Sequence, residues 1–337
     1  MNTSRSRRNA LGLAACAAAL ALATACSASA APKASPAEAG TSRTIVIDYV
    51  PGVSPFPYFD TAYRGAAERA KKYGYQVKYV PVSAYDATTQ NTVLNAELAS
   101  HPDFLLVSPV DDVSLRPAVQ RYLDAGIPVI TVGGTLKDTT GLVAQIATDN
   151  YQGGKLVAEH FGRQLGGRGT VAVLNIAPGS STVDDRVKGF NDTMRTSFPG
   201  ITVLKEQYGG ATVPSNQQAV RGLLLAHPET NAVFGATEVN GEGAIAAVAA
   251  VGRTGQIQVA AFDASPEEVK QLRAGKISFL SVSQPGNQAA LAVDFAHAHL
   301  TGDKASIKPS TLVPNVGVTK DNIDDPAVTP LLYTSGS

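Results

Sequence analysis

Cysteine is scarce in this chain of 337 residues, and tryptophan is absent. The only cysteines are Cys16 and Cys26, and both fall near the N-terminus. Cys16 lies in an apolar stretch that we expect to be removed, so the remaining chain can form no internal disulfide. The folded part must therefore be stabilised by burial of apolar side chains, and it is long enough to build two domains with a core each.

Charge is scarce as well. Lys and Arg number 28, Asp and Glu number 28, and charged residues make up 17% of the chain, against about 25% in an average soluble protein. This balance leaves no basic patch for a nucleic acid. After the N-terminal region no apolar run is long enough to cross a bilayer. Nucleic acid is therefore excluded as a partner, and a membrane contact is expected only through the N-terminus.

Motifs for catalysis, metals and cofactors are missing. Lys155 is followed by leucine, so there is no Walker A loop, and there is no Gly-x-Ser-x-Gly elbow. His297 and His299 are i,i+2 neighbours, which point to different faces of a helix. Residues 241–246 fit the dinucleotide fingerprint with alanine last, but Thr237–Asn240 separate them from the preceding strand, so the tight phosphate-binding turn is absent. We expect no enzyme, no metal and no cofactor.

The N-terminus has the pattern of an export signal. Three arginines among the first eight residues precede an apolar stretch, Leu11–Ala25, and small residues precede Cys26. The segment Leu22–Cys26 looks like a bacterial lipobox, which implies a signal at 1–25 and a diacylglycerol anchor on Cys26. A plain signal peptide cut elsewhere is the alternative, and the twin-arginine route is a weaker one. Residues 26–43, rich in Ala, Ser and Pro, are expected to be a flexible tether.

From Thr44 onward, short β-branched runs alternate with amphipathic stretches, which predicts βαβ units and parallel sheets. The first series has predicted strands at 44–49, 76–80, 104–107, 129–132 and 142–147, with helices at 64–73 and 115–125. The second has strands at 169–176, 201–207, 232–235, 256–261 and 277–282, with helices at 151–165, 184–197, 216–226, 243–251 and 266–274. A last helix at 287–300 and a strand at 311–318 are expected to cross back between two lobes. Two such halves predict ligand binding outside the carboxyl ends of their strands.

Several motifs, in this order and spacing, carry a resemblance to a known family. They are Pro57-Tyr58-Phe59, residues 126–132, residues 147–154, residues 186–190, residues 224–234, residues 262–266 and Gln284-Pro285. Together they resemble the ribose-binding-protein family of periplasmic and lipoprotein solute-binding proteins. The likeness covers nearly all of Thr44–Val318. It implies an α/β fold of two Rossmann-like parallel-sheet lobes joined by a three-segment hinge, the type I periplasmic binding protein.

The resemblance also implies organisation and function. The N-terminal lobe is expected to comprise 44–149 plus 285–309, and the C-terminal lobe 150–284 plus 310–333. Such proteins are monomers outside the cytoplasm that capture a sugar, polyol or related metabolite by hinged closure and deliver it to an ABC permease. The alternative is a sensor that presents its loaded form to a membrane receptor or kinase, because both roles use the same closure.

A sugar needs aromatic planes for its C–H faces and carboxylates, amides or guanidinium groups for its hydroxyls. Tyr58 and Phe59 suit the first task, although packing at a helix start is the alternative. Asp263 suits the second, because Ser265 and Glu268 already supply the cap of the next helix. Arg186 follows from the resemblance as a gripping arginine, with an ion pair to Asp184 or Asp185 as the alternative.

Further ligand and hinge residues follow from the resemblance. Glu238 and Asn240 stand near the place where relatives carry an Asn-Asp pair, and Gln284 is expected to bind the ligand by a hydrogen bond. Asp149 and Asn150 are expected at the first hinge segment, where capping of the next helix is an alternative, and Pro285 at the second.

Two departures from the family bear on the ligand. Gly133 and Gly134 replace an Asp-Arg pair of ribose-binding relatives, and Ala211 replaces an aromatic residue. We therefore expect a solute that is larger or less hydroxylated than a pentose, with part of its bulk in the room left by the two glycines. Under this hypothesis, restoring Asp and Arg at 133 and 134 weakens binding.

Overall fold

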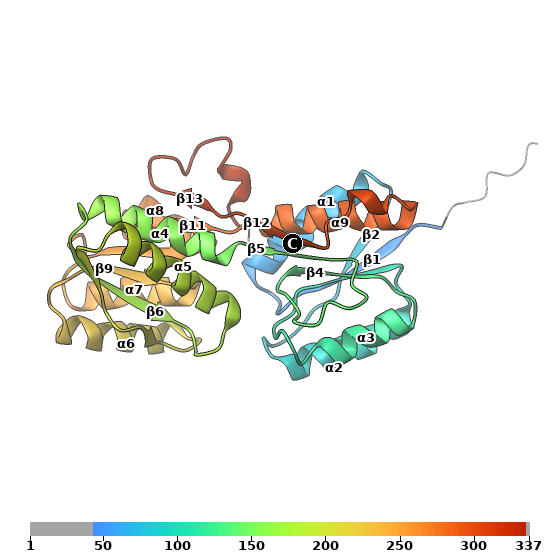
Figure 1. The fold of residues 1–337 in the computed structure, drawn as a ribbon, viewed down its shortest axis with the longest axis horizontal. Helices are drawn as coiled ribbons and strands as arrows, with labels where there is room; N and C mark the ends of the chain where they lie inside the picture. Colours follow the sequence, from blue (N-terminus) through green and yellow to red (C-terminus); the bar gives the residue numbers. More distant parts are fainter. Residues whose placement is uncertain (1–42, 335–337) are drawn as a thin grey trace, which may run out of the picture. The chain divides into compact units, whose positions relative to one another are not determined.

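A computed structural model describes residues 43–334, and all of these except Arg43 belong to one compact unit, Thr44–Ser337. The predicted signal, Cys26 and the tether as far as residue 42 lie outside the described residues. Within the described part of the chain, two sheets form two lobes (Figure 1). The predicted fold class is confirmed.

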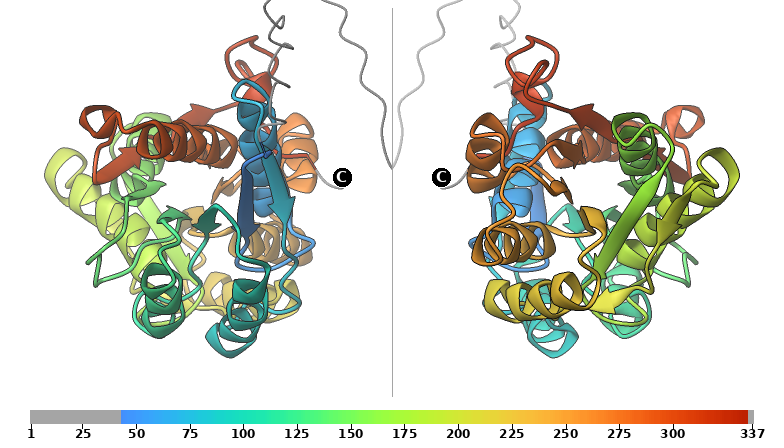
Figure 2. Two further views of the ribbon diagram at one scale, coloured as in Figure 1. Left: turned by 90° about the vertical axis from the view of Figure 1, so that its right-hand side faces the viewer. Right: turned by 90° about the vertical axis from the view of Figure 1, so that its left-hand side faces the viewer.

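The N-terminal lobe has a six-stranded parallel sheet in the order β12-β5-β4-β3-β1-β2. Its strands are β1 (Val46–Val50), β2 (Gln76–Tyr79), β3 (Phe104–Val107), β4 (Val129–Gly133), β5 (Ala144–Thr148) and β12 (Ser310–Val313). Helices α1 (Pro57–Lys71) and α9 (Pro285–Thr301) cover one face, and α2 (Ala87–Glu97) and α3 (Arg116–Asp124) cover the other, coloured teal in Figure 2. Each face buries its own apolar cluster, so the sheet is covered on both sides, as parallel sheets require.

The C-terminal lobe repeats this plan with one antiparallel edge. Its sheet runs β13-β11-β10-β9-β6-β7, with β8 also on β6, and among these described strands only β13 is antiparallel. The strands are β6 (Gly169–Asn175), β7 (Ile201–Val203), β8 (Gln207–Tyr208), β9 (Thr230–Gly235), β10 (Gln258–Phe262), β11 (Phe279–Val282) and β13 (Val316–Val318). The helices are α4 (Asn150–Gln164), α5 (Ser181–Ser197), α6 (Val213–Ala226), α7 (Glu238–Ala250) and α8 (Pro266–Arg273). Helices α4 and α5 pack on one face of the sheet and α6 to α8 on the other.

Three segments of the described chain join the lobes. The first lies between β5 and α4, the second between β11 and α9, and the third between β12 and β13. Gln284 Nε2 donates to the Pro314 carbonyl at 2.8 Å, and Asn315 Nδ2 donates to the Asp149 carbonyl at 2.8 Å. The three connections are therefore tied to one another by side-chain hydrogen bonds.

Two of the predicted strands are wrong in detail. Residues 311–318 were expected to form one strand, but they form β12 in the N-terminal sheet and β13 in the C-terminal sheet, with Pro314 between them. Proline has no N–H for a ladder, and it interrupts the pairing. Residues 310–313 therefore belong to the N-terminal lobe, not to the C-terminal lobe as expected. The predicted strand at 201–207 is likewise split, into β7 and β8.

None of the helices in the described part of the chain has the length and apolar character that a membrane span requires.

Candidate ligand site

The predicted ligand residues follow the carboxyl ends of strands in both sheets, which is where ligands bind in open α/β folds. Tyr58 and Phe59 follow β1, Glu238 follows β9, and Asp263 follows β10 directly. Arg186 lies on α5, the helix after β6. The residues from the two lobes come together at Tyr58, because its ring packs against the apolar cluster of the C-terminal lobe that contains Ala264 and Tyr333.

The N-terminal lobe contributes a group of aromatic rings. Tyr58 and Phe59 meet edge to face with their ring centroids 5.1 Å apart. The Tyr58 hydroxyl donates to Gln288 Oε1 at 3.3 Å. Burial, with the charge of Asp263 as a smaller cause, raises the pKa of Tyr58, so its hydroxyl is a neutral donor. Tyr85, on the loop after β2, is 62% exposed although its ring lies near Phe59 across Gly52. Phe59 is itself buried, with 8% of its surface exposed, so Tyr58 and Tyr85 offer most of the flat apolar surface of the kind that packs on sugar C–H faces.

Arg186 is held at the C-terminal sheet by three contacts. Its Nε donates to Asn150 Oδ1 at 2.9 Å, and its Nη1 donates to the Ala236 carbonyl at 2.9 Å. The guanidinium carbon lies 3.7 Å from the centre of the Phe262 ring, which is a cation–π contact. The alternative pairing with Asp184 or Asp185 is not made in the described structure. Nη2 has no partner among the described residues, so it is the donor left for a ligand.

Asp263 has an unusual backbone conformation for its residue type. Its φ is 82°, in the left-handed region that costs a non-glycine residue roughly 1 kcal/mol or more. Its N–H donates to the Ser281 carbonyl at 3.0 Å, so the backbone remains paired. Oδ1 accepts from the Tyr333 hydroxyl at 2.8 Å and also from Ser283 Oγ. No described residue donates to Oδ2, which leaves one carboxylate oxygen for a ligand.

The cap of α8 is as predicted. Ser265 and Glu268 form a complete capping box and Pro266 begins the helix, so Asp263 is not needed for capping. Glu268 is fully buried, its Oε2 accepts from the Ser265 N–H, and its Oε1 has no partner in the described structure. Burial raises the pKa of Glu268 well above its ordinary value, and the charges of Glu238 and Asp263 add to this effect.

Glu238 begins α7 and lies near the acids Asp263 and Glu268. Burial raises the pKa of Glu238 to about 7. A hydrogen bond with Ser265 acts against this rise, and the charges of Asp263 and Glu242 add to it. The carboxyl group therefore changes between donor and acceptor near neutral pH. Neighbouring acids with unequal environments are common at binding sites, although they also occur in structural networks.

Asn240 has a different environment from the one expected. Its side chain is fully buried, its Nδ2 donates to Asn216 Oδ1, and its Oδ1 accepts from Thr237 Oγ1 at 2.7 Å. Thr237 in turn caps α7. The amide nitrogen and oxygen each bond within the lobe, so Asn240 joins α6 to α7.

The hinge candidates lie at the connections between lobes. The Asp149 carboxylate caps α4 by accepting from the Gln152 N–H at 3.0 Å, and Asn150 holds Arg186. The Gln284 amide links the second and third connections, and its Oε1 accepts from Asn287 Nδ2 at 2.7 Å. Pro285 is the first residue of α9. Gln284 thus has protein partners at both ends of its amide.

The hypothesis that Gly133 and Gly134 leave room for ligand bulk is wrong. Gly133 has a φ of 80°, and a Cβ built on it would lie 2.6 Å from the Tyr58 hydroxyl oxygen. A Cβ on Gly134 would collide with the Pro109 carbonyl. The glycines are needed because backbone and Tyr58 already fill this space. The sequence comparison showed that two side chains were absent, but not which neighbours occupy their volume.

Three residues of the site were missed from the sequence: Tyr85, Phe262 and Tyr333. Tyr85 follows β2 near the carboxyl edge of the sheet, where ligands bind in open α/β folds, and this position is the signal that could have identified it. Phe262 is part of the family motif at 262–266, but the motif does not reveal its contact with Arg186. That contact depends on how α5 and β10 lie relative to each other. Tyr333 carries no signal, since it comes after the last predicted strand and reaches Asp263 across 70 positions.

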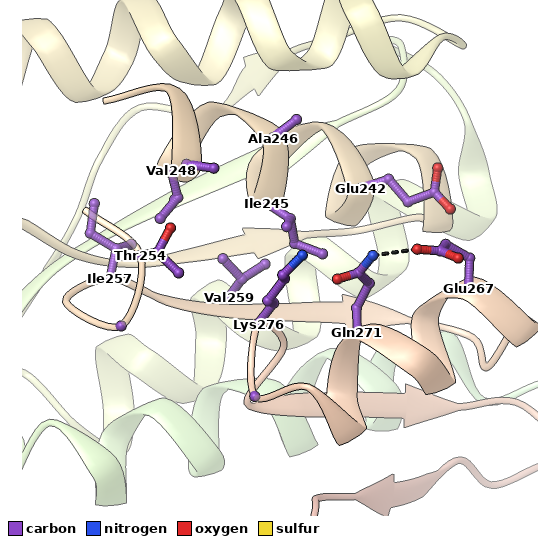
Figure 3. A pocket seen from close by; sticks show the side chains of 13 residues that line it. Glu242, Ile245, Ala246, Val248, Thr254, Ile257, Val259, Glu267, Gln271 and Lys276 are labelled. Atoms are coloured by element: carbon purple, nitrogen blue, oxygen red, sulfur yellow. Dashed lines mark hydrogen bonds between the residues drawn. The ribbon is translucent and has the colours of Figure 1, made fainter. Parts of the chain in front are cut away.

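A separate pocket of about 290 Å³ lies between α7 and α8 in the C-terminal lobe (Figure 3). Ile245 and Val259 form part of its wall, and Gln271 donates to Glu267 beside it. None of the predicted ligand residues lines this pocket. Among the described residues, no group of three or more His, Cys, Asp or Glu side chains could hold a metal ion.

Comparison with known proteins decides the family. A model described as periplasmic binding protein domain matches residues 47–304. The chain belongs to this family. It is a type I periplasmic sugar-binding protein, of the class of solute-binding proteins of ABC transporters, whose members work outside the cytoplasm.

Individual relatives agree with this assignment. The ribose import binding protein RbsB of Bacillus subtilis is 28% identical over 274 residues, which are 80% of this chain and 87% of that protein. A solute-binding protein of Agrobacterium vitis, solved with α-D-tagatopyranose, is 32% identical with a TM-score of 0.80 and covers 87% of this chain and 100% of its own. One of Actinobacillus succinogenes, solved with D-allose, is 25% identical with a TM-score of 0.76, covering 82% and 98%. These matched relatives are binding proteins for transport rather than enzymes.

Proposed function

We propose that this protein is an extracytoplasmic lipoprotein that captures one sugar, polyol or related small metabolite between its lobes and delivers it to an ABC permease. The observation that carries the proposal is that the two lobes contribute different kinds of group to the candidate site. The N-terminal lobe contributes the aromatic rings of Tyr58 and Phe59, and the C-terminal lobe contributes the polar groups of Arg186 and Asp263. A sugar needs both kinds of surface.

The hydrogen-bonding groups that are left unpaired at the candidate site support a hydroxylated ligand. Among the described residues, Arg186 Nη2 is a donor without a partner and Asp263 Oδ2 is an acceptor without one. Glu238 adds a carboxyl group that donates or accepts according to pH. One relative is named for ribose import, and two were solved with tagatose or allose bound. These relatives favour the same class of ligand for this protein.

Closure follows from the arrangement of the two lobes. A ligand that first contacts one lobe gains the remaining contacts only when the other lobe reaches it, so its binding favours the closed form. A shift from mostly open to mostly closed requires a preference of about 5.5 kcal/mol. A few charge-assisted hydrogen bonds, at roughly 1.5 kcal/mol or more each, together with packing on the rings, suffice for this.

The test is a thermal-shift and calorimetry screen of residues 44–337 against D-ribose, D-allose, D-tagatose, D-fucose, xylitol and myo-inositol. A bound sugar at a hundred times its Kd stabilises the protein by about 2.7 kcal/mol, a shift of a few degrees. Asp263→Asn should abolish the shift, and Asp321→Asn, at an exposed acid on the loop after β13, should retain it. If none of the six compounds raises the melting temperature of the wild type, capture of sugars and polyols of these kinds is refuted.

The anchor is proposed from the sequence. Mass spectrometry of the full chain expressed in a bacterium should find a diacylglycerol on Cys26 as the first residue, and Cys26→Ser should release the protein from the membrane fraction. We further propose that the protein acts as a monomer without a catalytic step of its own. A single species of about the chain's mass in size-exclusion chromatography with light scattering supports the first of these.

A further inference from the structure

The C-terminal segment reaches both lobes. After the turn Thr329–Leu331, the Tyr333 N–H donates to the Ala264 carbonyl of the C-terminal lobe at 3.0 Å. The next residue, Thr334, donates from its N–H to Thr61 Oγ1 on α1 of the N-terminal lobe at 3.2 Å. Arg64, also on α1, donates to Thr334 Oγ1. Two successive residues of one segment are thus bonded to different lobes, in addition to the three chain connections.

The Tyr333 side chain is part of the ligand site itself. Only 4% of the residue is exposed, and its hydroxyl lies 2.8 Å from both Asp263 Oδ1 and Ser283 Oγ. Its ring meets the Tyr58 ring at 82° with the centroids 5.9 Å apart, which is a favourable edge-to-face contact. Tyr333 therefore touches the acceptor of one lobe and the aromatic group of the other.

This contact restricts what Asp263 can offer to a ligand. A carboxylate with both oxygens free can bridge two neighbouring hydroxyls. Here Tyr333 and Ser283 both donate to Oδ1, so only Oδ2 is left without a described donor. The two donors also fix the carboxylate in one orientation. A residue that orients an acceptor in this way determines which hydroxyl of a sugar can reach it.

We propose that the segment Leu331–Thr334 is a fourth connection between the lobes and that Tyr333 is a specificity-determining residue, which positions Asp263 so that it accepts one ligand hydroxyl rather than a neighbouring pair. The inference deepens the proposed function and rests on it for the ligand. The link between the lobes does not depend on any ligand.

The first experiment compares Tyr333→Phe with the wild type by calorimetry on the six compounds named above. The variant keeps the ring on Tyr58 and loses the hydroxyl. The variant frees one acceptor position on Asp263 Oδ1. We therefore expect the affinities of the six compounds relative to one another to change by about ten-fold, the worth of one hydrogen bond to a charged group, and their order of preference to change with them. Tyr73→Phe is the matched control, because Tyr73 donates to Asp294 at 2.7 Å on the N-terminal lobe.

A purely structural role would alter the melting temperature without altering the order of preference. Unchanged affinities and order in Tyr333→Phe, or the same change in Tyr73→Phe, would overturn the role in specificity. If none of the six compounds binds even the wild type, the proposed function fails, and the role in specificity falls with it. The connection between the lobes is then judged by the second experiment alone.

The second experiment needs no ligand. Inter-lobe distances are measured by electron spin resonance between one label on α2 and one on α6, in residues 44–337. Arg64→Ala and a chain ending at Leu332 should both broaden the distance distribution, because the link to α1 is weakened or lost. Arg121→Ala is the control, since Arg121 bonds Asn95 within the N-terminal lobe alone. A distribution in the shortened chain identical to that of the wild type would refute the fourth connection.

Discussion

The hydroxyl of Tyr58 occupies the space that a side chain at Gly133 would need. A Cβ at that position would lie 2.6 Å from the hydroxyl oxygen, and the backbone there has a φ of 80°. The glycine and the tyrosine are therefore matched to each other, and the position of an aromatic ring at the candidate ligand site depends on a residue without a side chain.

Gly133→Ala should destabilise the protein through two separate causes. The positive φ costs roughly 1 kcal/mol or more for alanine, and displacement of Tyr58 adds to this. Gly74→Ala is the matched control, because Gly74 has a φ of 70° and no atom of the described residues lies within 4 Å of the place that its Cβ would take. Urea denaturation should show a larger loss at Gly133. Equal losses would mean that Tyr58 moves aside freely.

Arg186→Lys should weaken sugar binding much more than it lowers stability. Lysine cannot hold Asn150 and the Ala236 carbonyl while it presents a further donor and stacks on Phe262, because it lacks the planar fork. A charge-assisted hydrogen bond contributes about 1.5–3 kcal/mol, so calorimetry should find a loss of affinity of ten-fold or more. Arg195→Lys on the same helix, where the arginine is exposed and pairs with Asp192, should bind as the wild type does.

Ligand affinity should depend on pH through Glu238. Its pKa is raised to about 7, so the carboxyl group is protonated at pH 6 and ionised at pH 8. Glu238→Gln should remove the part of the pH dependence that falls between these values. The facing groups that also titrate or carry charge are Asp263, Glu242 and Glu268. Calorimetry at pH 6, 7 and 8 checks this, and an unchanged profile in the variant would assign the dependence to another group.

Glu268→Gln should stabilise the protein more at pH 8 than at pH 5. The folded pKa of Glu268 lies above its unfolded value, so the folded state binds more protons in this range and stability falls as pH rises. Glutamine keeps an acceptor for the Ser265 N–H and cannot ionise. Glu267→Gln is the control, because bonds to Lys270 and Gln271 lower the pKa of Glu267 and its replacement should not stabilise. Melting temperatures at both pH values decide the matter.

The alternation of strands and helices could be read from the sequence because buried parallel strands are continuous β-branched runs. Helix α2 was not predicted, since Ala87–Glu97 is rich in Thr and Asn and has few apolar residues, although Asp86 supplies a cap at its start. The single strand expected at 311–318 failed because the proline within it marks a change of lobe. Local patterns report an element's type, but not the sheet that it joins.

The candidate site was predictable only in part. Asp263 and Tyr58 follow strands, so their position at the carboxyl edge could be expected. The space around Gly133 depends on Tyr58, far away in the sequence, and was misjudged for that reason. The partners of the buried Asn240 amide include Asn216 on α6, which no local pattern indicates. Tyr333 depends on a tertiary contact that no local pattern indicates.

Small-angle X-ray scattering of residues 44–337, with and without the sugar that binds best in the screen, tests the central claim most directly. Capture between two lobes that close predicts a smaller radius of gyration in the saturated protein, and no change in Asp263→Asn at the same sugar concentration. A sugar that raises the melting temperature but leaves the radius of gyration of the wild type unchanged would contradict closure around the ligand.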